Sequence, residues 1–141
     1  MSSKTTKELT NALIKSEEIE AFLNSNKDEF LACNFLEQLL YFLHLKHKTK
    51  ADVIKLANLN RTYGYEIFRG EKIPSRDKFI ALSFGLELNF EETQTFLKRT
   101  ENRELYSRDK RDSLIIYCIS KEMNLIETNS FLYSMNEAVI D

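Results

Sequence analysis

Apolar side chains recur every three or four residues along most of this chain, in short runs separated by polar turns. This period is typical of amphipathic α-helices, because residues i, i+3, i+4 and i+7 share one face of a helix. A long apolar run is FLEQLLYFL at residues 35–43. The turns carry Ser, Thr or Asn, which are the residues that most often cap helix N-termini. The pattern therefore predicts an all-α protein built from short helices.

Composition agrees with this prediction and bounds the class of protein. The chain has 141 residues, only one proline and three glycines, which suits one helical domain with an appendage. No apolar run reaches the 18 residues of a membrane span, and residues 1–11 lack the apolar segment of a secretory signal. Cys33 and Cys118 lie within apolar helical patterns and read as buried free thiols. We expect a cytoplasmic protein with no membrane partner.

Residues 49–70 contain the most informative arrangement of helix ends. Thr49 is a good N-cap, and Asp52 stands three residues later, where it can reach back as in a capping box. Asn58 follows the apolar face of this first helix, and asparagine tolerates the left-handed backbone conformation that ends helices. The stretch thus predicts a short helix that stops at a tight turn.

A second short helix follows at once. Asn60 is its predicted N-cap, and the helix extends over residues 61–69. Gly70 supplies the next C-terminal stop. The predicted buried face consists of Gly64, Ile67 and Phe68. Two short helices joined by a tight turn form a helix-turn-helix unit, whose second helix can enter the DNA major groove.

The spacing of this stretch resembles that of the repressor/Cro-like (xenobiotic-response-element type) helix-turn-helix family. The match runs without a gap through Thr49, Val53, Asn58, Leu59, Arg61, Thr62, Ile67, Phe68 and Gly70, and continues into Pro74, Ser75 and Arg76. Ile54 departs from the pattern, because the family tends to have a small residue where the two helices cross. The resemblance implies a repressor-like five-helix bundle over residues 34–100.

The resemblance also implies roles for individual side chains toward double-stranded DNA. The residues expected to read base edges are Arg61, Thr62, Tyr63, Tyr65 and Glu66. Arg61 could pair with guanine O6 and N7, and Glu66 could accept a hydrogen bond from cytosine N4. The residues expected at the phosphates are Lys50, Asn60, Arg69, Lys72 and Arg76. A homodimer is expected, since such sites are usually read as paired half-sites.

Charge leaves a second interpretation open. Residues 49–112 carry 13 basic and 11 acidic side chains, a net charge of +2, within a chain of net charge −2. Any DNA affinity would therefore be modest and would fall steeply with salt. The alternative is a helix-turn-helix scaffold that has lost DNA binding and uses the same surface, with Tyr63 and Tyr65, to bind a protein partner.

An internal repeat organises the second half of the chain. Residues 76–97 and 111–132 are identical at 9 of 22 positions after a shift of 35 residues. Each copy reads as a helix, an Asn-capped turn and a second helix. The predicted N-caps are Ser75, Asn89, Ser107 and Asn124. Residues 101–141 are therefore predicted to form a C-terminal helical hairpin, and residues 1–33 an N-terminal helical extension.

Catalytic and metal-binding patterns find little support in the sequence. The segment at residues 63–70, YGYEIFRG, lacks the preceding strand and the closing Lys-Ser/Thr of a phosphate-binding loop. His44 and His47 share a helix face, but no nearby ligand completes a metal shell, and solvated histidines are the favoured interpretation. We predict no enzyme activity, no cofactor and no metal. The function predicted is that of a sequence-specific DNA-binding transcriptional regulator.

Overall fold

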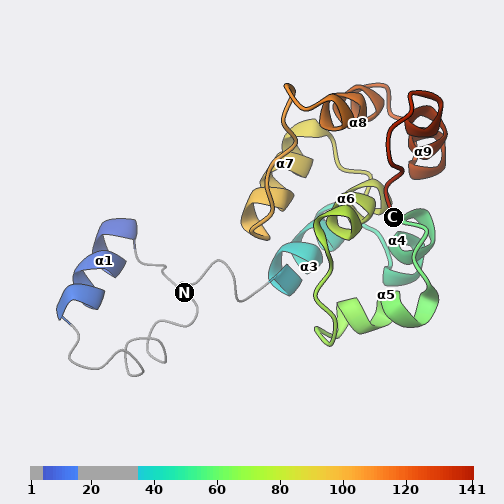
Figure 1. Ribbon diagram of the computed structural model, residues 1–141. Coiled ribbons are helices and arrows are strands. Elements are labelled where there is room, and N and C mark those ends of the chain that lie inside the picture. The colour runs from blue at the N-terminus through green and yellow to red at the C-terminus, as the bar shows by residue number, and fades with distance from the viewer. Residues whose placement is uncertain (1–4, 16–34) are drawn as a thin grey trace. The chain divides into compact units, whose positions relative to one another are not determined.

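The computed structural model describes residues 5–15 and 35–141, and within them it contains helices and no strands (Figure 1). None of these described helices has the length and apolar character that a membrane span needs. The prediction of an all-α protein is thus confirmed for the described part of the chain. The helices are α1 (Thr6–Lys15), α3 (Phe35–Leu45), α4 (Lys50–Leu56), α5 (Arg61–Phe68), α6 (Arg76–Gly85), α7 (Phe90–Arg99), α8 (Lys110–Ser120) and α9 (Leu125–Ser134).

The chain divides into two compact units, residues 1–34 and residues 35–141. In the first unit, α1 begins with a reciprocal cap. The Glu8 backbone N–H donates to Thr5 Oγ1 over 3.1 Å, and the Thr5 N–H donates to Glu8 Oε2 over 3.3 Å. The rest of the predicted N-terminal extension, including Cys33, lies outside the described residues.

The core of residues 35–141 is built around aromatic side chains from α3, α6 and α7. The ring of Phe79 packs edge-on against Phe35 and against Phe96, with centroids 5.9 and 5.7 Å apart. Phe42 packs on Phe96 in the same way, 5.8 Å away. Edge-to-face pairs add about 0.5–1.5 kcal/mol each beyond the area that they bury. The apolar run at residues 35–43 thus places α3 across the α6–α7 hairpin.

The helix-to-helix turns of residues 35–141 share one backbone design. The α4–α5 turn has a left-handed residue, Asn58 (φ 53°), and the next N–H, from Leu59, donates to Ile54 O over 3.0 Å. This is the Schellman arrangement, which satisfies carbonyls at a helix end. The α3–α4, α6–α7 and α8–α9 turns repeat it around His47, Glu87 and Glu122. The turn itself therefore does not distinguish α4–α5 from the other helix pairs.

Most predicted N-caps are confirmed. Thr49 and Ser75 accept hydrogen bonds from the third backbone N–H of α4 and α6. Asn89 and Asn124 form complete capping boxes with Glu92 and Glu127.

The cap predicted at Ser107 is wrong. Helix α8 begins two residues later, where Asp109 Oδ1 accepts the Asp112 N–H over 2.9 Å. A carboxylate at a helix N-terminus also interacts favourably with the helix dipole, which explains why Asp109 is used there.

The departure at Ile54 is accommodated by a glycine. Ile54 is buried where α4 meets α5, and a Cβ built on Gly64 would lie only 2.7 Å from Ile54 Cγ1. The space that the Ile54 side chain needs is thus left free by the absence of a side chain at Gly64 on α5. Gly85 plays a similar part between α4 and α6, because a Cβ there would lie 2.6 Å from the carbonyl oxygen of Val53. Helix α4 is therefore fixed between two glycine contacts.

The internal repeat is also a repeat in space, and its two copies exchange contacts reciprocally. Arg76 Nη2 donates to Asp112 Oδ2 over 2.8 Å, and Arg111 Nη2 donates to Asp77 Oδ2 over 2.9 Å. In the first copy the Gln94 side chain bonds both backbone groups of Leu105, and in the second copy Asn129 does the same to Ile140. Such mutual exchange is the pattern of a two-fold interface. The correspondence therefore extends to residues 76–106 and 111–141.

Candidate functional site

The first turn of α5 presents polar side chains to solvent. Arg61 and Thr62 are exposed, while Gly64, Ile67 and Phe68 are buried, as the sequence predicted. Asn60 fixes the start of the helix, because its Oδ1 accepts the Tyr63 N–H over 3.1 Å. This bond uses one end of the Asn60 amide, so the predicted phosphate contact would have to come from its NH₂ group.

Two tyrosines on α5 are half-buried, and each carries a cation over its ring. Arg61 lies 6.0 Å from the centroid of Tyr65, and Lys78 Nζ lies 5.8 Å from the centroid of Tyr63. Cation–π contacts of this kind contribute about 0.5–1 kcal/mol at exposed sites. The contact with Tyr65 holds the Arg61 side chain along α5. The contact with Tyr63 places Lys78 at this surface, a residue that the sequence analysis did not assign to it.

Among the residues predicted at phosphates, Lys50 and Lys72 are both exposed. Lys50 Nζ lies 5.8 Å from the centroid of Phe68, so the N-terminus of α4 lies beside the last turn of α5. Glu66, predicted to read a base, is half-buried on the same helix.

Arg69 is exposed but paired. Its Nε and Nη2 donate to the two carboxylate oxygens of Glu71 over 2.9 and 3.0 Å. The hydrogen bonds from Arg69 lower the pKa of the Glu71 carboxyl below its usual value, so this acid stays charged at neutral pH. The Arg69 charge is therefore compensated inside the chain.

Arg76, also predicted at a phosphate, has its donors engaged elsewhere. Besides the Asp112 pair, its Nε donates to Arg103 O over 2.9 Å and its Nη2 to Glu104 O over 3.3 Å. A guanidinium with all of these partners has little left to offer a phosphate. The structure places Arg76 in the contact between the two copies of the repeat, and its phosphate role stays a prediction. The sequence signal for this contact was the Arg-Asp dipeptide that both copies of the repeat contain, at residues 76–77 and 111–112.

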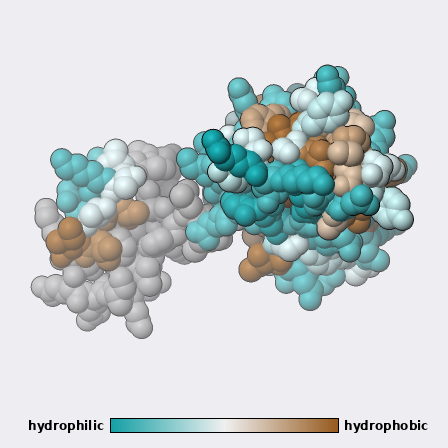
Figure 2. All heavy atoms as spheres, turned by 45° about the horizontal axis from the view of Figure 1, so that its top comes forward, coloured by the Kyte–Doolittle hydropathy of each residue, from teal (hydrophilic) through white to brown (hydrophobic). Residues whose placement is uncertain are grey.

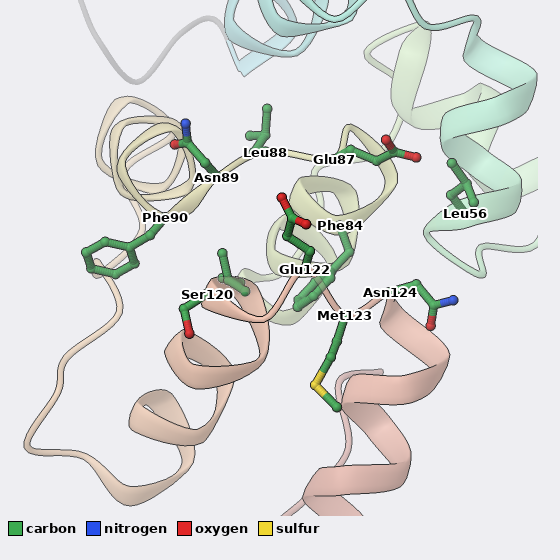
Figure 3. A pocket seen from close by; sticks show the side chains of 11 residues that line it. Leu56, Phe84, Glu87, Leu88, Asn89, Phe90, Ser120, Glu122, Met123 and Asn124 are labelled. Carbon is green, nitrogen blue, oxygen red and sulfur yellow. The ribbon is translucent and has the colours of Figure 1, made fainter.

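A pocket of about 600 Å³ lies where the α6–α7 and α8–α9 turns meet (Figure 3). Its lining comes from equivalent positions of the two copies, such as Glu87 and Glu122, together with Leu56 at the end of α4. Much of its polar lining is already engaged, since Glu87 pairs with Lys48 over 3.1 Å and Ser120 Oγ donates to Tyr117 O over 2.6 Å. The pocket is thus a cleft between structural turns.

The described residues contain no group of three or more His, Cys, Asp or Glu side chains that could hold a metal ion. His44 and His47 are both exposed. Cys118 is fully buried, and burial raises the pKa of its thiol above the usual value. The thiol is consequently protonated at neutral pH, and its position in the core suits a structural role.

Comparison of the chain with protein-family models, with curated proteins and with solved structures gave no match. The described residues therefore define only the class of the protein, which is all-α. Its α4–α5 pair exposes polar side chains, and its α6–α7 hairpin is repeated in space by α8–α9.

Proposed function

We propose that this protein is a sequence-specific DNA-binding transcriptional regulator that inserts the outward face of α5 into the major groove. In this proposal Arg61, Thr62, Tyr63, Tyr65 and Glu66 face the base edges. Lys50 and Lys72 contact phosphates, and Lys78 joins them through its position over Tyr63.

The exposure of Arg61 and Thr62 on the first turn of α5 carries this proposal. Within residues 35–141, α8 lies at the opposite end from α5, whereas α9 comes close to Asn58 in the α4–α5 turn (Figure 1). An Arg at the start of a helix can reach guanine O6 and N7 together, and one such pair is worth about 1–3 kcal/mol of discrimination between bases. The Asn60 cap and the Gly64 contact support the proposal, because they fix the helix that would carry these side chains.

The proposal is tested by selecting bound fragments from a pool of random duplexes, followed by fluorescence anisotropy on the selected site. We expect Arg61→Ala to lose about tenfold or more in preference for the selected site over random duplex. Lys50→Ala should weaken both duplexes alike and reduce the salt dependence, because a phosphate contact carries no sequence information.

Lys98→Ala is the matched control, since Lys98 is an exposed lysine on α7. This variant should bind as the unmodified chain does. If no duplex binds at about 50 mM salt, where phosphate contacts are strongest, the proposal is wrong. The stoichiometry measured in the same titration tests the expected homodimer, which should place two chains on each selected site.

The protein-interaction alternative is favoured by one observation, the pair between Arg69 and Glu71. This pair leaves less positive charge on the surface near α5 than its basic residues suggest. A protein partner would then contact the half-buried Tyr63 and Tyr65, because tyrosines are frequent anchors of protein interfaces. Duplex binding that does not change in Arg61→Ala, with a protein captured through Tyr65, would favour this alternative.

A further inference from the structure

The two copies of the spatial repeat bury equivalent positions to different extents. Leu82 is fully buried in the first copy, whereas its counterpart Tyr117 is 48% exposed in the second. Phe96 is fully buried, whereas its counterpart Phe131 is half-buried. In three more pairs the residue of the first copy is likewise the more buried one: Phe79 against Leu114, Leu86 against Lys121, and Thr100 against Met135.

The difference follows from what covers the first copy. Helix α3 packs on the α6–α7 hairpin through Phe42, whose ring meets Phe96, and through Lys46, whose Nζ bonds Glu92 Oε1 over 2.7 Å. Helix α4 also packs on the first copy, where Gly85 of α6 meets the backbone of Val53. No described helix of this unit takes the corresponding place on the second copy.

The uncovered surface, here called the α8–α9 face, consists of Leu114, Tyr117, Lys121, Glu127, Phe131 and Met135. Its centre is aromatic, because the rings of Tyr117 and Phe131 lie 5.5 Å apart, and Lys121 Nζ lies 5.7 Å from the Tyr117 centroid. In Figure 2, which brings the α8–α9 end forward, hydrophobic side chains gather among hydrophilic ones. An apolar centre with a charged rim is the anatomy of a protein interface.

Glu127 gives the α8–α9 face a charge preference. It is the counterpart of Glu92, which binds both the Asn89 N–H and Lys46. Glu127 keeps the first of these bonds, to the Asn124 N–H over 3.0 Å, but no described Lys or Arg pairs with its carboxylate. A helix seated here as α3 is seated on the first copy would place a lysine beside this carboxylate.

We propose that the α8–α9 face binds an amphipathic helix of a partner protein that has the pattern of α3. This pattern places aromatic or aliphatic residues at the first, fifth and eighth positions and a lysine at the twelfth, as Phe35, Leu39, Phe42 and Lys46 do. Helix-in-groove recognition commonly uses anchors at this spacing. The proposal does not depend on DNA binding, because α5 takes no part in it.

The probe for this proposal is a fluorescein-labelled peptide of residues 35–48, titrated with the full chain and followed by fluorescence anisotropy. We expect saturable binding that Tyr117→Ser weakens about tenfold, since a central tyrosine is the kind of side chain that carries interface energy. Tyr133→Ser is the matched control, because Tyr133 is 77% exposed on α9 but lies outside the α8–α9 face. It should leave binding unchanged.

Exchanging the charges of the peptide lysine and of Glu127 shows whether the peptide binds the α8–α9 face or displaces α3 from the first copy. A peptide with Lys46→Glu should bind several-fold more weakly, and Glu127→Lys in the protein should restore its binding. Glu92 stays intact in that variant, so restoration would identify the α8–α9 face.

The proposal is overturned if the peptide does not bind, or if Tyr117→Ser and Tyr133→Ser bind it equally well. It is also overturned if sedimentation shows the chain to self-associate and Tyr117→Ser abolishes this. The face would then join two copies of the chain.

Discussion

At the scale of single residues, the helix ends depend on left-handed residues that are mostly not glycine. Helices α3 to α9 each end next to a residue with positive φ, and only Gly70 among these is a glycine. The others are His47, Asn58, Glu87, Glu101, Glu122 and Asn136. A side chain in this conformation costs roughly 1–2 kcal/mol, less for asparagine, so these turns hold strain that the surrounding bonds overcome.

Glu122 offers a direct test of this strain. It has φ 57°, and its side chain is exposed. We expect Glu122→Gly to raise the free energy of unfolding by about 1 kcal/mol, because glycine adopts positive φ without a steric cost. Urea unfolding followed by circular dichroism measures the change. Glu122→Ala is the control and should give no gain, so an equal gain in both variants would argue against the strain.

Residue-scale features were the easiest to predict from the sequence. A cap bonds a backbone N–H three residues away, so Asn60, Asn89 and Asn124 could be identified from local spacing alone. Ser107 shows the limit, because Ser107 and Asp109 are both good caps and only the fold decides between them. The pairing of Arg76 could not be predicted from local spacing, since its partner Asp112 lies 36 residues along the chain.

At the scale of elements, helix α4 is positioned by two close contacts with glycine. Ile54 fills the space that Gly64 leaves open, and Gly85 lets α6 approach the backbone of α4. The sequence showed that Ile54 departs from the family pattern, but the compensating residue lies on another helix. The helix predicted over residues 61–69 ends one residue earlier in the structure, which is within the range in which helix ends differ between criteria.

The contact between α4 and α5 predicts coupling between Ile54 and Gly64. Gly64→Ala should lower the free energy of unfolding by about 1–3 kcal/mol, because the added methyl group meets the Ile54 side chain. Ile54→Ala alone should cost about 2–5 kcal/mol through the cavity that it leaves. The double variant should lose at least about 1 kcal/mol less than the two single losses combined. Chemical denaturation of the four proteins measures this.

Gly85→Ala, combined with Ile54→Ala in the same way, is the control for this double-variant experiment. A Cβ on Gly85 meets the carbonyl oxygen of Val53 and not the Ile54 side chain, so Ile54→Ala cannot relieve it. We expect these two changes to add. If Gly64→Ala and Ile54→Ala also simply add, the close approach between α4 and α5 is not what the structure indicates.

At the scale of the whole unit, two ion pairs with the same chemistry join the copies of the repeat in different surroundings. Asp112 is 1% exposed, whereas its counterpart Asp77 is 30% exposed. The cost of losing one partner rises with burial, because the remaining charge has less water to solvate it. The sequence repeat predicted two similar hairpins, but it could not show which of the two carboxylates would be buried.

These ion pairs provide a matched comparison. We expect Asp112→Asn to lower the free energy of unfolding by about 3 kcal/mol and Asp77→Asn by about 1 kcal/mol. Thermal and urea unfolding of the two variants measure the difference. Equal losses would show that burial does not distinguish the two pairs.

The mutual exchange of Arg and Asp between the two hairpins has a consequence for how such a protein arises and assembles. Two separate chains that met through this contact would form a dimer only above some concentration. When a duplication joins the two hairpins in one chain, their contact becomes intramolecular and has a fixed, high effective concentration. Pairing then survives dilution, and the second hairpin is free to diverge on the face where the first hairpin is covered by α3.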